Sequence, residues 1–401
     1  MSVPSSINDN SRWTRAGFIF LGIFAVADFL SISVAQIAAA GLVVCWVGQW
    51  VSTKTKPDFT PLKWPITAFV VASILAALFS LDVMESIRDS KDLLHIAIFF
   101  AAYDLFRRDQ GKAGLIFRLM AASAGLIAAV GVAEVAIKGL HIHHRITGFQ
   151  DIWMTYAGLL MLAIVVTCSL IMFTFTKWRD SWLVVFLALM AVAMILSLTR
   201  NAWIGAMAGV AIVAVMRKPI SLAIIPALSV VVFLLSPAGV QDRITSMVDL
   251  QDDSNRERLL LWRAGAKIWA DYPVFGVGQN SFPLVYPQYR DPGVLEPEIS
   301  HLHNNFLEIG VERGIIGFLA WLSIWCVALF VMVKAWMKRG DDKMVEMALV
   351  ASIGSVTAFL AAGMFEYNFG DSEIQMLVYF ILAIGLAASG ADSKKKRQVA
   401  K

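Results

Sequence analysis

Charged residues are scarce in this sequence. Only 16% of the 401 residues are Asp, Glu, Lys or Arg, while 58% are hydrophobic. An average soluble domain carries roughly 25% charged residues. A shortfall of this size, concentrated in blocks, indicates an integral membrane protein and excludes an ordinary soluble domain. The net charge is only +4, so electrostatic binding to nucleic acid is not indicated either.

Cysteine is rare as well. Cys45, Cys168 and Cys326 all fall inside apolar runs, where we expect them to behave as small buried hydrophobes. They form neither a disulfide framework nor a metal-binding spacing. The segment "GVGQN" at 276–280 is a lone glycine turn without GxxxxGK, so it does not indicate a nucleotide-binding loop.

Two metal-site alternatives stay open on the residue types alone. The His-x-His pairs His141/His143 and His301/His303 would supply zinc ligands, and the acidic pairs at 296–298 and 371–373 would supply carboxylate ligands. Neither HExxH nor a Cys/His framework accompanies them. We therefore expect no metal and no cofactor.

Long apolar runs are what the sequence has in abundance. A bilayer core about 30 Å thick needs about 20 apolar residues in helical form, and lipid forces such spans to be helices. The fold expected is an all-α integral membrane protein with about 12 transmembrane helices. No small-residue cleavage site follows the first run, which we interpret as an uncleaved span. The expected spans cover residues 16–31, 34–52, 65–81, 93–106, 114–137, 153–175, 182–198, 202–216, 219–236, 314–335, 344–364 and 373–390.

Lysine and arginine predict the orientation. With the N-terminus in the cytoplasm, 21 basic residues lie on the cytoplasmic side, and the short opposite connections hold five: Arg88, Lys91, Lys138, Arg145 and Arg200. This asymmetry favours an even number of spans with both termini cytoplasmic. The chain then divides into nine helices within 1–237, one large extracytoplasmic loop at 238–313, three helices within 314–390 and a basic cytoplasmic tail at 391–401.

The large loop is expected to contain a helix. Ser254 or Asn255 would cap it, and it would run to about Trp269 before Pro273. One face would be basic (Arg256, Arg263, Lys267) and another apolar (Leu259, Trp262, Ala266, Trp269). Such a helix suits the membrane–water boundary. Its arginines either contact lipid headgroups or bind a phosphate group bidentately.

Other ionisable groups gather on the same predicted side. The stretch "HLHNNFLEIGVERG" at 301–314 holds two histidines near a helix start, and "EYNFGDSE" adds Glu366, Tyr367, Asp371 and Glu373. An imidazole can accept a proton near neutral pH, although these histidines would alternatively only hydrogen-bond at the helix start. Arg200 either snorkels to the interface or forms a buried anion site.

Three segments together resemble a known family. They are "TRNAWIG" around Arg200, "RLLLWRAGAKIWADYPVFGVGQNSF" at 258–282 and "HLHNNFLEIGVERGIIG" at 301–317. In this combination the chain is similar to the bacterial O-antigen ligase and O-antigen polymerase superfamily. The resemblance implies a GT-C-type membrane glycosyltransferase. It would transfer glycan from a polyprenyl diphosphate carrier at the periplasmic face of the bacterial inner membrane.

The resemblance also implies roles for individual residues. His303 would be the general base, with His301 as a possible assistant, and Asn304 would orient these groups. Independently of the resemblance, Glu308 lies five residues after His303 in the sequence and would orient or charge it. The donor diphosphate would be bound, in place of a metal ion, by Arg200, Arg258, Arg145 and Arg263.

The partners implied by the resemblance are an undecaprenyl-diphosphate-linked O-antigen donor, a lipid A-core oligosaccharide acceptor and membrane lipids, without nucleic acid. The modest length and the His301/His303 doublet favour a ligase, and a single direct displacement would make it an inverting enzyme. A polymerase and a protein O-oligosaccharyltransferase with a pilin-like acceptor remain alternatives. A polyprenyl-glycan transporter is an alternative from another class, but its site would lie near the midplane of the membrane.

Overall fold

The computed structural model describes residues 12–54, 61–139, 145–176, 178–223, 226, 230, 233–295 and 297–390. Throughout these residues the regular structure is helical, and no strand occurs among them. The helices are α1 (Arg12–Ala27), α2 (Ile32–Thr53), α3 (Lys63–Leu78), α4 (Val83–Asp89), α5 (Ile96–Arg108), α6 (Ala113–Lys138), α7 (Trp153–Thr174), α8 (Ser181–Leu196), α9 (Arg200–Arg217), α11 (Ala238–Thr245), α12 (Asp253–Asp271), α13 (Phe282–Tyr289), α14 (Asn305–Met337), α15 (Lys343–Ala362) and α16 (Ser372–Ser389). Short 3₁₀ helices are η1 (Ser90–His95), η2 (Gln110–Lys112), η3 (Trp178–Asp180), η4 (Pro219–Ala223) and η5 (Asn368–Gly370).

The all-helical, multi-pass membrane character expected from the sequence is confirmed. Seven stretches within the described residues are long and apolar enough to cross a membrane: Ile32–Thr53, Gln110–Lys138, Trp153–Thr174, Trp178–Leu196, Asn305–Met337, Lys343–Ala362 and Ser372–Ser389. The predicted number of about 12 spans is not confirmed by this set. The expected span at 219–236 lies partly outside the described residues, and the tail at 391–401 lies wholly outside them. Cys45 is buried as expected, but Cys326 is exposed on α14, where lipid is its natural surrounding.

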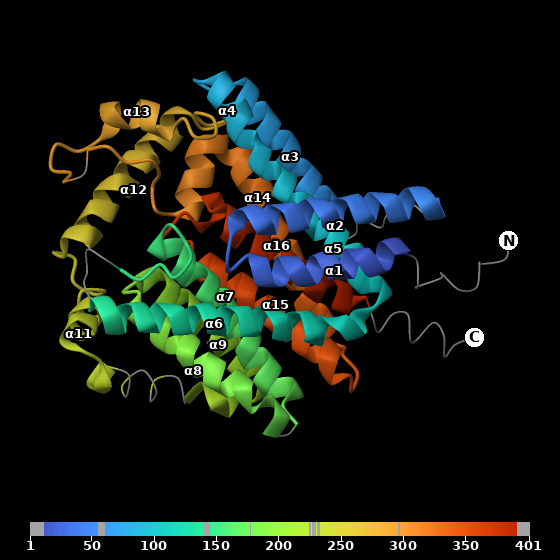
Figure 1. Cartoon of the computed structure of the whole chain (residues 1–401). Coiled ribbons are helices and arrows are strands. Elements are labelled where there is room, and N and C mark those ends of the chain that lie inside the picture. Colours follow the sequence, from blue (N-terminus) through green and yellow to red (C-terminus); the bar gives the residue numbers. More distant parts are fainter. Residues whose placement is uncertain are drawn as a thin grey trace.

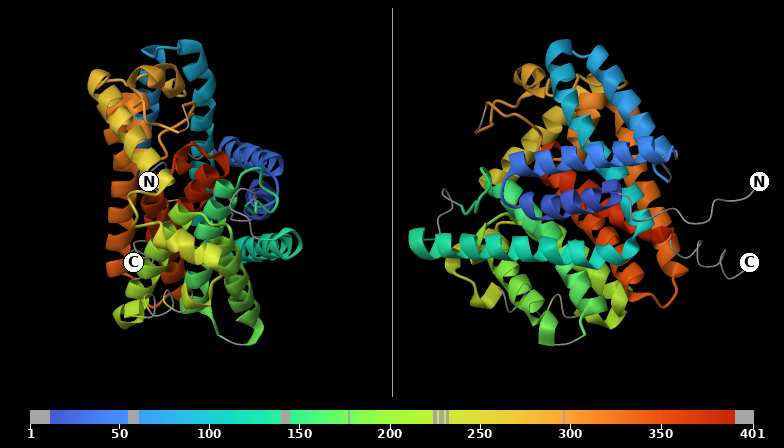
Figure 2. Two further views of the ribbon diagram at one scale, coloured as in Figure 1. Left: turned by 90° about the vertical axis from the view of Figure 1, so that its left-hand side faces the viewer. Right: turned by 45° about the vertical axis from the view of Figure 1, so that its right-hand side comes forward.

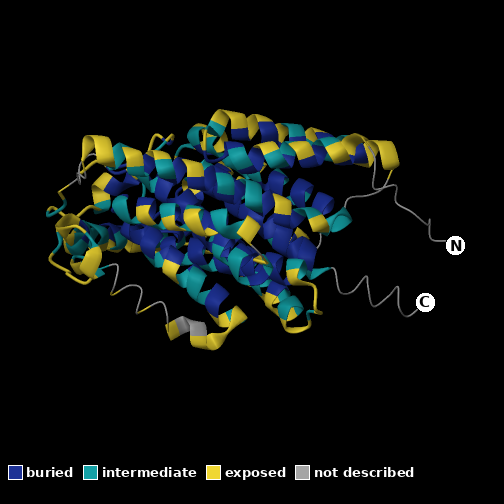
Figure 3. Ribbon diagram, turned by 60° about the horizontal axis from the view of Figure 1, so that its bottom comes forward, coloured by how far each residue is buried: buried dark blue, intermediate teal, exposed yellow. Residues whose placement is uncertain are grey.

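Three helices form the centre of the bundle. The helices α7, α15 and α16 are apolar on all sides and largely buried. This pattern is typical of a helix that other helices enclose. α15 packs against α7, α9 and α16. Small residues allow α9 to approach α15 closely. A Cβ on Gly205 would lie 2.7 Å from Ala358 O, and a Cβ on Gly209 would lie 2.8 Å from Gly354 O. Figure 3 shows buried residues in the middle and exposed residues on the outer helices.

The elements of the large connection lie together at one end of the bundle. α11, α12 and α13 gather there, whereas α1 begins and α16 ends at the opposite end (Figure 1). α1 and α2 pack side by side, and α6 runs along one side of the bundle (Figure 2). The loop-derived helices therefore cover one end only.

The large connection has a small hydrophobic core of its own. It joins α12 to α13, to the segment between them and to the start of α14, through the buried residues Leu261, Ala264, Ile268, Val277, Phe282, Val285, Tyr286, Ile299, Leu302 and Val311. α12 is therefore held against protein, since it packs on both α13 and α14.

Two details of the predicted loop helix are wrong. The N-cap of α12 is Asp252, whose side chain accepts a hydrogen bond from Asn255 N, so neither Ser254 nor Asn255 caps it. The expected apolar face also differs from the buried one: Leu259 is exposed, whereas Leu261, Ala264, Gly265 and Ile268 are buried. The contacts with α13 and α14, which periodicity along one helix does not reveal, select this face.

α14 is interrupted at Gly314, whose φ of 61° and ψ of −170° are not helical. The backbone of residues 273–278 runs beside the interruption and bonds to it: Ile315 N donates to Pro273 O (2.8 Å), Val277 N to Val311 O (2.9 Å) and Gly278 N to Glu312 O (3.0 Å). Groups freed by the break are thus satisfied by another segment. The glycine turn at 276–280 therefore has a structural role, and it sets the direction of residues 305–313.

Replacing Gly314 with alanine is expected to destabilise the protein. It should also reduce any activity that depends on residues 305–313, although it changes no side chain of the candidate site. The left-handed φ alone costs roughly 1–2 kcal/mol for a residue with a Cβ, and that Cβ would lie 2.2 Å from the Val274 carbonyl oxygen. Thermal unfolding in detergent measures the loss. Gly239→Ala is the matched control, because no atom lies within 4 Å of its Cβ position. Equal melting temperatures for the two variants would contradict the role given to Gly314.

Candidate active site

The connection before α14 carries both candidate histidines in an unusual backbone conformation. His303 has a φ of 48°, the left-handed region that residues with a Cβ rarely adopt. Among the described non-glycine residues, only Lys54, Leu198 and Asn280 share a positive φ. Leu198 precedes Arg200 by two residues and Asn280 lines the cavity described below. Strained residues of this kind collect at functional sites.

Leu302, between the two histidines, is fixed from both sides. Its N–H donates to Glu308 Oε2 (2.6 Å), and its carbonyl oxygen accepts from Trp262 Nε1 (3.1 Å). Its side chain is fully buried against Gly265 of α12. Glu308 therefore holds the loop rather than contacting His303, which is how it contributes to orientation.

His303 is paired with a buried carboxylate. Its Nδ1 lies 2.8 Å from Glu366 Oε1, and Glu366, on the α15–α16 connection, is only 6% exposed. Burial raises the pKa of Glu366, but the hydrogen bond and charge of His303, with smaller contributions from His301 and Tyr367 N, bring it below the ordinary value. An ionised Glu366 would hold the proton on Nδ1 and leave the Nε2 lone pair free to accept another.

His301 has a different environment. Its Nδ1 accepts a hydrogen bond from His303 N (3.3 Å), and the two rings meet edge to face at 4.3 Å. Burial lowers the pKa of His301 to about 4, with His303 adding to the shift and Glu366 opposing it. His301 is therefore neutral at physiological pH, and its contact fixes the backbone that carries His303.

Asparagines hold the start of α14 to the α15–α16 connection. Asn304 caps α14 by accepting from Phe306 N (2.9 Å) and Leu307 N (3.0 Å), and its Nδ2 donates to Met364 O (2.8 Å). Asn305 donates its N–H to Gly363 O (2.7 Å) and accepts from Phe369 N (3.0 Å). These bonds keep His303 and Glu366 in register, although 63 residues separate them.

Arg200, 6% exposed, is bound to the α11–α12 connection. Its Nη1 donates to the Ser246 carbonyl (3.2 Å), the Ser246 hydroxyl (2.9 Å) and Asp252 Oδ1 (3.3 Å), and its Nη2 donates to Ser254 Oγ (3.0 Å). This guanidinium thus joins α9 to the N-terminal end of α12, and part of its donor capacity is already used.

Three further arginines lie close enough to Arg200 to feel its charge. Burial lowers the pKa of Arg145, and Arg200 and Arg258 lower it further. Burial, followed by Arg200 and Arg145, lowers the pKa of Arg243 to about 10. For Arg258 burial lowers the pKa, Glu366 opposes that shift and Arg200 adds to it. We call these four residues, Arg145, Arg200, Arg243 and Arg258, the arginine cluster.

The arginine cluster is a candidate anion site, because partly buried like charges gain when an anion joins them. Asp252, in an ion pair with Arg200 (3.3 Å), offsets part of this charge. Arg243 was not predicted, since no motif surrounds it in the sequence. Arg263, predicted as a phosphate ligand, is exposed on α12. At about 100° per residue it points about 140° away from Arg258.

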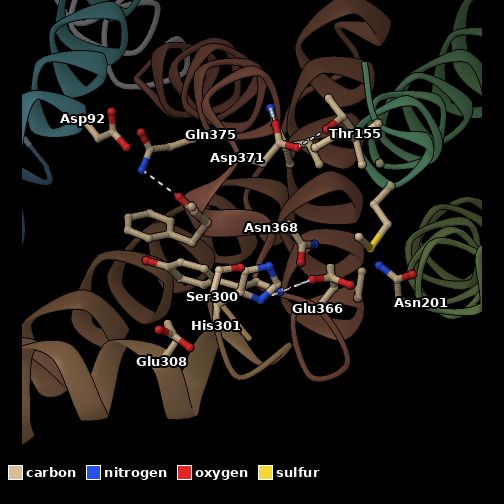
Figure 4. Close-up of a pocket in the computed structure, with 18 of the residues that line it drawn as sticks. Asp92, Thr155, Asn201, Ser300, His301, Glu308, Glu366, Asn368, Asp371 and Gln375 are labelled. Atoms are coloured by element: carbon tan, nitrogen blue, oxygen red, sulfur yellow. Dashed lines mark hydrogen bonds and ion pairs between the residues drawn. The ribbon is translucent and has the colours of Figure 1, made fainter. Parts of the chain in front are cut away.

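A cavity of about 300 Å³ opens beside the histidines. His301, Glu366 and Asn368 line it, and Asn201, the residue after Arg200, reaches it from α9 (Figure 4). Glu366 therefore borders both parts of the site: it bonds to His303 and lines the cavity, and its charge acts on Arg258. Sequence reasoning noticed Glu366 as an outer-face carboxylate but not as the partner of His303.

The structure offers a set of metal ligands that differs from both alternatives predicted from the sequence. The ligand atoms of His301, His303 and Glu366 all lie within 4.8 Å of one another, and a His₂Glu set suits zinc chemically. The other histidine pair, His141/His143, and Glu296 lie outside the described residues. Asp371, from the second acidic pair, instead caps α16 by accepting from Ile374 N (3.2 Å) and also accepts from the Thr155 hydroxyl.

Comparison with known families places this geometry in context. A family model described as O-antigen ligase matches residues 185–322, from α8 into the second part of α14. Residues 185–322 are therefore similar to the O-antigen ligase family. The matched segment contains both candidate histidines and three members of the arginine cluster. The resemblance predicted from the sequence is thereby confirmed, and members of the matched family are glycosyltransferase-like enzymes, either ligases or polymerases. A search of curated proteins found no match to the chain.

Proposed function

We propose that the protein is an O-antigen ligase of the GT-C type that transfers O-antigen polysaccharide from undecaprenyl diphosphate to lipid A-core oligosaccharide at the periplasmic face of the bacterial inner membrane. One observation carries the proposal. Within and beside the family segment, Glu366 bonds to His303, and its charge also acts on Arg258 of the arginine cluster. This arrangement supports a proton acceptor near a binding site for a departing diphosphate.

The arginine cluster would bind the donor diphosphate. Guanidinium groups match phosphate oxygens geometrically and remain charged, and fixed positive charge stabilises the negative charge that develops on the leaving group. Arg258 and Arg145 are the candidates for direct contact. Arg200, already bonded to Ser246, Asp252 and Ser254, would add its field and hold α12. A contact from the exposed Arg263 remains a prediction.

His303 would activate the acceptor. Its Nε2 removes the proton of an acceptor hydroxyl as the oxygen attacks the anomeric carbon, and Glu366 stabilises the imidazolium that forms. The new carbon–oxygen bond replaces the bond to the diphosphate, which leaves with its electron pair. A single displacement from the opposite side inverts the anomeric configuration. The proton then passes from His303 to water, and no metal takes part.

Other members of this superfamily differ in the acceptor. A polymerase would use a second carrier-linked repeat, and a protein O-oligosaccharyltransferase would use a pilin-like protein. A polyprenyl-glycan transporter would carry its site near the midplane. The gathering of the arginine cluster close to α11 and α12, at one end of the bundle (Figure 1), favours an enzyme.

Glycan transfer by the purified protein in detergent tests the proposed function. Detergent micelles do not separate two compartments, so a transporter would show no activity in this assay, whereas a glycosyltransferase would. We expect lipid A-core to gain O-antigen from undecaprenyl diphosphate, equally with and without EDTA. Extension of a carrier-linked repeat would identify a polymerase, and modification of pilin would identify the third alternative. Transfer to none of these acceptors would contradict the proposal. Inhibition by EDTA that zinc reverses would instead assign a metal to His301, His303 and Glu366.

A further inference from the structure

The cavity beside His303 is strongly acidic, in contrast to the arginine cluster. Six acidic residues line it: Asp89, Asp92, Glu308, Glu312, Glu366 and Asp371. Among them, Glu308 accepts a hydrogen bond from Leu302 N, and burial raises the pKa of Asp371. The only guanidinium in its lining, Arg313, forms an ion pair with Glu312. The pKa of Asp89 is raised to about 6, first by burial and then by Glu312 and Asp92. A phosphate group entering this space would meet like charge.

Two residues that line the cavity each have a buried oxygen without a hydrogen-bond donor. Among the described residues, Glu366 Oε2 and Asn368 Oδ1 lack any partner, and these residues are only 6% and 3% exposed. Both line the cavity, as Figure 4 shows. A buried acceptor without a donor is costly. A ligand that presents O–H or N–H groups would satisfy these oxygens.

The cavity and the arginine cluster meet at the reacting groups. Asn201 lines the cavity next to Arg200 in the chain, and Glu366 lines it while bonded to His303. Fields of opposite sign, one from the arginine cluster and one from the acidic cavity, would direct two substrates to different places by their charge. The phosphate-bearing substrate is drawn to the arginine cluster, and the cavity is left for the other substrate.

We propose that this cavity is the acceptor subsite, and that it takes the end of a glycan that carries hydroxyl or ammonium donors and no phosphate. The inference rests on the proposed glycosyl transfer and narrows its acceptor. The terminal sugar places one hydroxyl at His303 while its other donors bond to Glu366 and Asn368. An amino sugar is favoured by the surrounding carboxylates, and a phosphorylated sugar is rejected by them.

The test uses the full-length protein in detergent, undecaprenyl-diphosphate-linked O-antigen as donor, and two core oligosaccharides that differ only in a phosphate on the terminal sugar. We expect the phosphorylated acceptor to have a KM at least about tenfold higher, because like charges are brought together in a partly desolvated site. This ratio should shrink at high salt, which screens the repulsion. The donor KM should be the same with either acceptor.

Two cavity variants make the result specific. Asp92→Asn should reduce the discrimination against phosphate several-fold, and Asn368→Leu should raise the KM of both acceptors, because a hydrogen-bond acceptor is lost without a change in charge. Neither should alter the donor KM. Asp341→Asn, the same chemical change in the exposed α14–α15 connection, is the matched control and should leave both KM values unchanged.

The outcomes distinguish failure of the acceptor-subsite proposal from failure of the proposed glycosyl transfer. If the wild-type protein transfers glycan to neither acceptor, the proposed function fails. If it transfers to both with equal KM, or if the cavity variants change the donor KM alone, the acceptor subsite is overturned while the glycosyl transfer stands. If acceptor binding requires added Mg²⁺ or Ca²⁺, the carboxylates form a cation site and the inference is likewise overturned.

Discussion

Replacing His303 with alanine is expected to lower the rate of glycan transfer by about 10²–10⁴-fold, the usual contribution of a positioned general base. The acceptor hydroxyl is a weak nucleophile, and no other imidazole in the described site has a proton-accepting nitrogen so arranged. Donor affinity should be unchanged, because the arginine cluster stays intact. The measurement is the initial transfer rate of purified protein, with donor binding determined separately on the same preparation.

Two neighbouring variants serve as comparisons for His303→Ala. His301→Ala should cost less, since His301 accepts a hydrogen bond from the His303 backbone and acts through position. Glu366→Gln should fall between them: an amide oxygen can still accept from Nδ1, but it carries no charge to stabilise the imidazolium. In that variant kcat should fall while the donor KM holds. Full transfer by His303→Ala would exclude it as the base.

The helical membrane fold was predictable because lipid leaves an apolar chain few alternatives. Details of the helix ends were not. The first span was expected to reach residue 31, but α1 ends at Ala27, and the span expected at 93–106 begins inside the 3₁₀ helix η1. Hydropathy reports which residues tolerate lipid, whereas the ends of helices depend on turns and packing. The break at Gly314 likewise depends on the backbone of residues 273–278.

Within the site, residue types were predictable and pairings were not. Histidines and arginines stand out in an apolar chain, so His303, Arg200 and Arg258 were noticed from the sequence. Glu308 was chosen as the orienting acid because it is near in sequence, yet its carboxylate bonds to Leu302 N. The partner of His303 is Glu366, which Asn304 and Asn305 bring close from the α15–α16 connection. Such a pairing follows only from tertiary contacts.

Replacing Arg258 with alanine is expected to raise the donor KM by about 10–100-fold, which corresponds to the loss of one or two charge-assisted hydrogen bonds. No hydrogen bond joins its guanidinium to another residue of the described chain, so the melting temperature should hardly change. The salt dependence of donor binding should also weaken, because one phosphate-facing charge is gone. Arg256→Ala, an exposed arginine of the same helix, is the control and should leave the donor KM unchanged.

Arg200→Ala should behave differently from Arg258→Ala. The difference distinguishes a role in donor binding from a role in holding α12 against α9. Its removal leaves Asp252, Ser246 and Ser254 without their donor, so we expect a lower melting temperature together with a higher donor KM. Arg200→Lys retains the charge but not the geometry that reaches all three partners, so it should recover donor binding more than stability. If Arg258→Ala binds donor as tightly as the wild type, the diphosphate does not lie in the arginine cluster, and the direction of attack on the anomeric carbon assigned to His303 loses its support.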